Sequence, residues 1–337
     1  MSETTHTHQE MRGPGERLSW NDDATIRVGI STCLLGQAVR WDGGHKRDQF
    51  LTNVLGRYVE WVPVCPEFEV GMGIPREPVR LVKRGREIHV LGVKSGRDWT
   101  TVMRSWVEGR ARELTKLELS GFVLKKDSPS CGMERVKVYD KTGGSRKEGS
   151  GLFAEALMRH QTMLPVEEEG RLNDPMLRES FIERIFAYQH LCSLFSKRWT
   201  VGSVVAFHAK YKLQLMAHSP QAYTRLGRLV AQVKCSPRAE FRERYKTVFM
   251  AALTEGATRR GHVNVMQHCL GYFREHLNQK ARDALLGIVE DYRAELVPLV
   301  VPLTIMRHYA QVLGIEYLAR QAYLEPHPKE LMLRNHA

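Results

Sequence analysis

The segment Ile26-Arg-Val-Gly-Ile-Ser-Thr-Cys-Leu-Leu-Gly36 decides how the first half of the chain folds. Its apolar run ends at Ile30 and a turn that closes on a glycine follows, which is typical of a short buried strand. Further strands are expected at residues 59–64, 88–93, 121–125 and 136–139, and helices at 50–58, 100–117 and 151–159. This alternation of strands and helices predicts an α/β domain, with a mainly parallel sheet and flanking helices.

The pattern changes at an acidic stretch between Pro165 and Pro175, which predicts a linker between two domains. Beyond it, apolar residues recur at spacings of three and four, which predicts an all-α domain of about six helices. The polar N-terminal residues have no such pattern and predict a disordered tail. The expected organisation is a tail at 1–24, the α/β domain at 25–165, the linker at 166–176 and the helical domain at 177–333.

The chain is basic, with 50 Lys and Arg residues against 38 Asp and Glu residues and a formal charge of +12 over 337 residues. The tail is acidic, whereas residues 25–165 and 166–337 carry excess positive charges of eight and seven. Two basic segments favour a polyanionic partner, nucleic acid above all, with a membrane surface as the alternative. No apolar run reaches the length of a transmembrane helix, and the N-terminus lacks a secretory signal. We therefore expect a cytoplasmic protein without a membrane-spanning segment.

Three of the six cysteines follow predicted strands. Cys33 comes shortly after the first strand, Cys65 directly after the second, and Cys131 shortly after the strand at 121–125. Because ligands in open α/β sheets bind at the carboxyl ends of the strands, we expect these side chains at one edge of the sheet. Disulfides are rare in the cytoplasm, so three thiolates there suit a metal centre. Zinc with an open position and an iron–sulfur cluster with three cysteine ligands both fit this pattern.

The other three cysteines lie in the helical half, where packing roles are expected. They are Cys192, Cys235 and Cys269. A second metal site built from His262, His268 and Cys269 is a weaker alternative.

Five short motifs occur in order along the first half: Ile30-Ser-Thr-Cys-Leu-Leu-Gly36, Val39-Arg-Trp-Asp-Gly-Gly44, Val64-Cys-Pro-Glu67, Pro75-Arg-Glu-Pro78 and Ser128-Pro-Ser-Cys-Gly132. Together they resemble the thiouracil desulfidase family, over about residues 26–171. The second half contains Phe207-His-Ala-Lys-Tyr-Lys212 and Met216-Ala-His-Ser-Pro220. It resembles a helical domain of unknown function that is often fused behind that family. The fused arrangement is similar to bacterial enzymes that remove the sulfur of 4-thiouridine in tRNA.

The resemblance implies an iron–sulfur enzyme that releases sulfide from a thiolated pyrimidine. In that family three cysteines hold a [4Fe–4S] cluster, and the match places them at Cys33, Cys65 and Cys131. One iron lacks a protein ligand and is open to the sulfur of the substrate's C=S group. The implied reaction converts 4-thiouridine in tRNA to uridine by hydrolysis of the C–S bond. A modified base inside a folded tRNA must be extruded to reach such a site.

Hydrolysis of this kind needs a group that moves protons. Glu67 is the expected general acid or base, and Ser128 is the second catalytic candidate. Ser130 and Asp42 are candidates for binding the substrate. Phosphate contacts are expected from Arg40, Lys46, Arg47, Lys125 and Lys126, and from the basic loop at 141–147. In the helical half the candidate tRNA contacts are Lys210, Lys212, Arg225, Arg228 and Arg238.

Two other functions fit these residues. The same chemistry on free thiouracil or a thionucleoside is one, although a free base needs no basic helical half. A non-catalytic iron–sulfur protein that binds RNA or senses a signal is the other, and it would hold the cluster without turnover of a thiolated substrate.

Overall fold

The first strand, β1 (Arg27–Ser31), lies inside a four-stranded sheet whose paired strands all run parallel. The order is β2-β1-β5-β8, with β2 at Glu60–Val64, β5 at Gly121–Leu124 and β8 at Val166–Glu168. Val28 and Ile30 are fully buried, as expected for a strand with neighbours on both sides and packing on both faces. The prediction of an α/β domain with a mainly parallel sheet is therefore confirmed.

The computed structural model describes residues 25–196 and 198–335. The tail expected at residues 1–24 lies outside the described residues.

A second four-stranded sheet has the order β4-β3-β6-β7 and mixed directions. Strands β3 (Val79–Arg84) and β4 (Glu87–Gly92) form an antiparallel hairpin, and β3 also pairs in parallel with β6 (Val136–Tyr139). The outer strand β7 (Ser145–Gly149) runs antiparallel to β6. The stretch at 141–147, expected to be a basic loop, is a loop only up to residue 144, because residues 145–147 begin β7 and pair with β6 in an exposed hairpin.

Helices α2 (Thr100–Thr115) and α3 (Leu152–His160) pack against one face of the parallel sheet. Phe122 of β5 meets Phe153 of α3 at 5.5 Å between ring centroids. The helix expected at 50–58 is instead one π-helical turn followed by one 3-10 turn. The expected helical character is present there, but no continuous α-helix forms.

The stretch at 166–176, expected to be a linker, contributes strand β8 to the parallel sheet. Phe122, Val123 and Leu124 of β5 pair with Val166, Glu167 and Glu168. The predicted linker is wrong at these positions. Acidic residues are normally solvated, but Glu167 and Glu168 are buried and hydrogen-bonded. The α/β fold thus extends into the expected linker.

The remaining chain is helical throughout its longer elements, which confirms the predicted all-α character. In the described residues it has seven helices of twelve residues or more and one single-turn helix, instead of about six. They are α4 (Pro175–Ser196), α5 (Val201–His218), α6 (Pro220–Ala231), α7 (Arg238–Thr254), α8 (Arg259–Phe273), α9 (Gln279–Arg293), α10 (Val300–Val312) and α11 (Glu316–Ala319). Over the part of the chain that the structure describes, no helix combines the length and apolar character needed to cross a bilayer.

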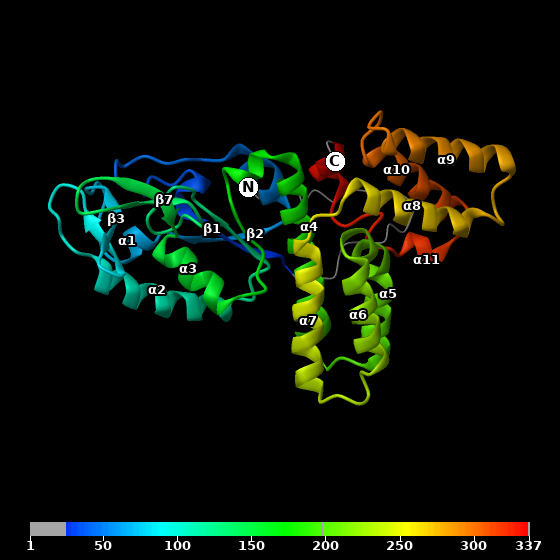
Figure 1. Ribbon diagram of the computed structural model, residues 1–337, viewed down its shortest axis with the longest axis horizontal. Coiled ribbons are helices and arrows are strands. Elements are labelled where there is room, and N and C mark those ends of the chain that lie inside the picture. Colours follow the sequence, from blue (N-terminus) through cyan, green and yellow to red (C-terminus); the bar gives the residue numbers. More distant parts are fainter. Residues whose placement is uncertain (1–24, 197, 336–337) are drawn as a thin grey trace, which may run out of the picture.

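Helix α4 covers the other face of the parallel sheet and joins the two halves (Figure 1). Its Phe181 and Ile185 pack in one cluster with Val28, and Leu333 from the C-terminal end joins the same cluster. Arg334 fixes this end, because its Nε donates to Glu179 Oε1 at 2.9 Å. Because these side chains come from both halves of the chain, the two halves share one core at this junction. Full burial of each such aliphatic or aromatic side chain stabilises the fold by about 1.5–3 kcal/mol.

A buried ion pair in the helical half makes stability depend on pH. His218 Nε2 lies 2.8 Å from Glu183 Oε1, and both side chains are less than one-tenth exposed. Burial alone would raise the pKa of Glu183, but His218, with a smaller effect of the Arg334 charge, lowers that pKa to about 2. Burial would lower the pKa of His218, but Glu183 outweighs it and raises that pKa. The contribution of Glu183 to the free energy of unfolding is lost as the pH falls below about 4.5 toward 2. The His218 contribution is complete below about pH 6.5 and is lost as pH rises through the higher folded-state pKa.

We therefore expect Glu183→Gln to destabilise the protein by about 3–5 kcal/mol near pH 6, because one partner of a buried pair is left uncompensated. The loss should shrink as pH rises and His218 becomes neutral. Urea unfolding followed by far-ultraviolet circular dichroism from pH 5 to pH 9 measures it. A loss that stays constant across this range would contradict the assignment.

Candidate active site

A cavity of about 370 Å³ opens at the carboxyl ends of β1, β2 and β5. Cys33, Cys65 and Cys131 all line it. Strand β2 leads directly into α1 (Pro66–Glu69), on the side of the sheet that points away from the helical half (Figure 1). The structure thus brings together three cysteines that are separated by 32 and 66 residues in the sequence.

Short turns position the first two cysteines. Cys33 lies in a 3-10 turn, Thr32–Leu35, which ends at Gly36 with a φ of 91°. Only glycine adopts this left-handed conformation without steric cost, so the turn can close directly after the strand. Cys65 precedes α1, and its backbone N–H donates to Glu69 Oε1 at 2.9 Å. Both cysteines are therefore fixed by backbone geometry at the ends of buried strands.

The third cysteine lies in a tightly packed loop after β5. The backbone N–H of Cys131 donates to Ser128 Oγ at 3.1 Å. A Cβ atom on Gly132 would lie 2.4 Å from Val136 Cγ2, and one on Gly151 would lie 2.4 Å from the carbonyl carbon of Ser130. These approaches are too close for any side chain, so both glycines are needed for the loop to reach the cavity.

The three thiols are desolvated and interact with one another. Burial and then Cys65 raise the pKa of Cys33 to about 11. Burial also raises the pKa of Cys65. For Cys131, burial raises the pKa most, and the other two cysteines raise it further. The three thiols are soft sulfur donors that face one cavity, and each disfavours the negative charge of the others. A bound cation would stabilise their thiolate forms, so this set is suited to one. Among the described residues, no three His, Cys, Asp or Glu side chains close on one point as a single-ion site requires.

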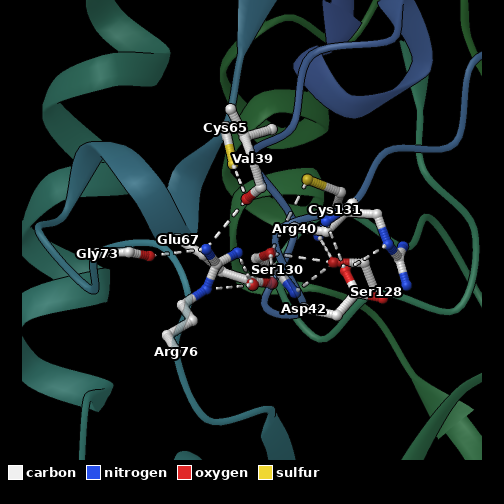
Figure 2. Close-up of polar contacts among 11 residues, drawn as sticks. Val39, Arg40, Asp42, Cys65, Glu67, Gly73, Arg76, Ser128, Ser130 and Cys131 are labelled. Atoms are coloured by element: carbon white, nitrogen blue, oxygen red, sulfur yellow. Dashed lines mark hydrogen bonds and ion pairs between the residues drawn. The ribbon is translucent and has the colours of Figure 1, made fainter.

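Glu67 lies beside the cysteines and is held by two partners (Figure 2). Its Oε2 accepts from Arg76 Nη2 at 2.6 Å, and its Oε1 accepts from Ser130 Oγ at 2.7 Å. Arg76 is itself fixed, because its Nη1 donates to the carbonyl oxygens of Val39 and Gly73, each at 3.0 Å. The Arg76 and Glu67 side chains are 6% and 15% exposed, so this carboxylate is largely shielded from water.

The two serines form a directed hydrogen-bond chain toward Glu67. Ser130 Oγ lies 3.0 Å from Ser128 Oγ, and its own hydrogen is donated to the carboxylate. Ser130 therefore accepts from Ser128, whose oxygen in turn accepts from the backbone N–H groups of Ser130 and Cys131. Ser130 is buried whereas Ser128 is half-buried. Ser128 thus stands at the open end of the chain and Ser130 in its middle.

The predicted substrate contacts divide into two groups. Arg40, Lys46, Lys125, Lys126 and Ser130 line the cavity. Arg47 and Asp42 are not among the lining residues. Arg47 donates instead to Thr52 and Asn53, and Asp42 accepts from the backbone of Gly44 and lies 3.6 Å from Arg40. The hydrogen bond from Gly44, then the nearby Arg40 charge, lower the pKa of Asp42, so this residue is an exposed turn-forming carboxylate.

Within the part of the chain that the structure describes, the residues that line the cavity come from positions 31–131. The basic stretch at 141–147 and the cations predicted in the helical half are not among these lining residues. His262 is also placed elsewhere, because its Nδ1 lies 3.0 Å from the hydroxyl of Tyr323. Of the other cysteines, Cys269 is buried in a helical core cluster and Cys235 is exposed.

Three residues at the cavity were not predicted. Arg76 holds Glu67, Glu169 binds the ammonium group of Lys125 and the backbone N–H of Lys126, and Trp41 lines the cavity opening. Arg76 and Trp41 lie within motifs that were recognised, but no spacing rule indicates which motif residues point into a cavity. Glu169 lies in the acidic stretch whose composition predicts a linker.

The comparisons with known proteins separate the two halves. The family described as 2-thiouracil desulfurase matches residues 28–169, and the family described as a protein of unknown function, DUF1722, matches residues 212–328. The protein YbgA of Escherichia coli (strain K12), described as uncharacterized, is 32% identical over 158 residues, which cover 47% of this chain and 94% of YbgA. The protein YbbK of Bacillus subtilis (strain 168), also described as uncharacterized, is 32% identical over 154 residues, which cover 43% of this chain and 97% of YbbK.

One solved structure matches with 31% identity and a TM-score of 0.38, over 46% of this chain and 99% of the other. It is described as the [4Fe-4S]-dependent thiouracil desulfidase TudS.

Proposed function

Because the chain belongs to the 2-thiouracil desulfurase family in its N-terminal half, with a DUF1722 domain behind it, we propose that it is an iron–sulfur-dependent desulfidase of 4-thiouridine in tRNA. The observation that carries the proposal is one cavity that combines three buried or half-buried thiols with a Glu67 carboxylate and a serine chain. Such a cavity has the donors for a thiophilic cofactor and the groups for proton transfer.

The thiol set fits a [4Fe–4S] cluster with one open iron. Cys33, Cys65 and Cys131 are the lining side chains with soft donor atoms, and thiolates are the ligands of such clusters. When bound, the cluster would supply a Lewis acid with affinity for the sulfur of a C=S group. Lys125 and Arg40 favour the thiolate form of Cys33, since their positive charges oppose the effect of burial on its pKa.

The protein side chains would move the protons of hydrolysis. Glu67 Oε1 is the acceptor at the end of the serine chain, and Arg76 keeps that carboxylate oriented toward Ser130. Ser128 lies at the open end, where its hydroxyl can meet a polar atom of the substrate or a water molecule. We assign Glu67 as the general acid or base and Ser128 as the group that contacts the substrate. Ser130 relays the proton between these two residues.

The excess positive charge of both halves supports RNA as the substrate. The second candidate is desulfidation of free thiouracil or a thionucleoside by the same cavity. One observation favours it: no described residue of the helical half lines the cavity, so the α/β half alone supplies the described contacts for a small substrate.

Anaerobically purified full-length protein distinguishes these functions. Sulfide release is measured from tRNA that contains 4-thiouridine, from the free 4-thiouridine nucleoside and from 2-thiouracil. We expect kcat/KM to be highest for tRNA, and we expect iron and acid-labile sulfide in the protein. The same tRNA made without thiolation is the matched control.

Each alternative has its own result. Sulfide release from free 2-thiouracil or the nucleoside alone would overturn tRNA as the substrate. A protein with iron and sulfide that turns over none of the three would favour the non-catalytic sensor. A colourless protein that contains zinc would overturn the cluster.

A further inference from the structure

Trp41 is an exposed aromatic side chain at the opening of the cysteine cavity. Among the described residues that line the cavity it is the one aromatic side chain, and 43% of its surface is exposed. Large apolar side chains are normally buried, so an exposed indole at the opening of a candidate active site indicates a contact surface.

The backbone of Trp41 has structural contacts that its side chain does not share. Its carbonyl oxygen accepts from the backbone N–H of Arg76 at 2.9 Å, and it lies in a turn closed between Arg40 and Gly44. These contacts hold the loop beside the residue that orients Glu67. Because they involve main-chain atoms, the indole can be changed without removing them.

The residues that line the cavity with Trp41 carry an excess of positive charge. Of the lining residues that the structure describes, five are cationic and two are carboxylates, and one of each is used in the pair between Arg76 and Glu67. The others are Arg40, Lys46, Lys125, Lys126 and Asp127. Lys125 is paired with Glu169, and Arg40 lies 3.6 Å from Asp42. Lys46 and Lys126 are exposed, and the Lys126 ammonium lies 3.9 Å from the exposed Asp127 carboxylate. Such a surface pair is weak, so a phosphate group can replace it.

A substrate that is part of an RNA strand must leave its neighbouring nucleotides outside the cavity. The cavity of about 370 Å³ is small compared with a folded RNA, and its lining residues in the described part of the chain lie within 31–131. The first contact with the rest of the strand therefore falls on the cavity opening. An aromatic face surrounded by cations is the usual binding surface for unpaired nucleotides, because bases stack on the ring and phosphates pair with the charges.

We propose that Trp41 stacks on the base next to the thiolated nucleotide, and that Lys46 and Lys126 bind the adjoining phosphates. This surface would make the α/β domain selective for a thiolated base within an RNA strand. The inference rests on the proposed RNA substrate and deepens it, because it names the residue that recognises the polymer. A base that loses its neighbour by extrusion regains a stacking partner on the indole.

The test compares Trp41→Ala and Trp41→Phe with the wild-type holoprotein. Phe68→Ala is the matched control, since Phe68 is an aromatic residue of α1 that is 49% exposed and does not line the cavity. The first measurement is the dissociation constant for a fluorescently labelled tRNA that contains 4-thiouridine, obtained by anisotropy at fixed salt. The second is KM and kcat for that tRNA and for the 4-thiouridine nucleoside.

We expect Trp41→Ala to weaken tRNA binding about tenfold, because stacking on an aromatic ring contributes at this level. The loss should exceed the change in KM for the nucleoside, and Trp41→Phe should recover most of it. Phe68→Ala should bind tRNA like the wild type. Equal losses for tRNA and nucleoside, an equal loss in Phe68→Ala, or no tRNA binding by the wild type would each overturn the proposal. Tight tRNA binding that depends on Trp41 but releases no sulfide would uphold this inference and overturn the proposed desulfidase function.

Discussion

Alanine at Cys33, Cys65 or Cys131 is expected to remove the iron–sulfur cluster and all sulfide release. Each thiol faces the same cavity, and with three ligands no cysteine is redundant. Folding should persist, because loss of one small buried group costs on the order of 1 kcal/mol. Iron and acid-labile sulfide are measured after anaerobic reconstitution, together with the visible absorption of the cluster and the sulfide released from thiolated tRNA.

Cys235→Ala is the control for this series, because Cys235 is exposed in the helical half. It should keep the iron content and the activity of the wild type. Full iron content in any one of the three cavity variants would remove that cysteine from the ligand set. A loss of iron in Cys235→Ala would contradict the assignment as a whole.

Glu67→Gln is expected to lower kcat about 10²- to 10⁴-fold while the iron content stays unchanged, since this is the usual contribution of a general acid or base. The amide has nearly the same shape and can still accept a hydrogen bond from Ser130, but it cannot take up a proton. It also leaves the Arg76 guanidinium without its carboxylate partner. KM should change far less than kcat, because the proton is transferred in the reaction step.

Two further variants are compared with Glu67→Gln, one that keeps the charge and one that serves as a control. Glu67→Asp keeps the charge and should retain more activity than Glu67→Gln. Glu60→Gln is the matched control, because Glu60 lies at the other end of β2, exposed and paired with Arg27. Sulfide release by Glu67→Gln at the wild-type rate would exclude Glu67 from proton transfer. Circular dichroism and iron analysis separate a catalytic loss from a folding defect.

The sequence predicted the α/β domain well because buried strands have clear apolar runs. Val28, Ile30, Phe122 and Leu124 are buried on both faces of the sheet and stand out in the pattern. It failed at 166–168, where two acidic residues concealed an edge strand. Hydrophobic periodicity carries no signal for a carboxylate that is buried and satisfied by hydrogen bonds, such as Glu168 with the backbone of Met133.

The sequence predicts a catalytic role for Ser128 and a substrate-binding role for Ser130. The structure places Ser130 in direct contact with Glu67 and Ser128 one hydrogen bond further away. Loop residues have no periodicity, so the direction of each side chain depends on the close packing at Gly132 and Gly151. The position of Arg76, which donates hydrogen bonds to Glu67 and to the carbonyl oxygen of Val39, likewise depends on contacts between two loops.

The sequence by itself determined that three cysteines arrive at one edge of the α/β domain, because parallel strands end at a common edge and each cysteine follows a strand. It also determined the division into an α/β half and a basic helical half. Only the tertiary structure decided which polar residues share the cavity with the thiols, because those contacts join loops distant in sequence. It also decided that, among the described residues, the cavity is lined by positions 31–131 and that the exposed Trp41 is one of them. Helix α4 packs on a face of the sheet, so it joins the two halves and leaves the strand ends free.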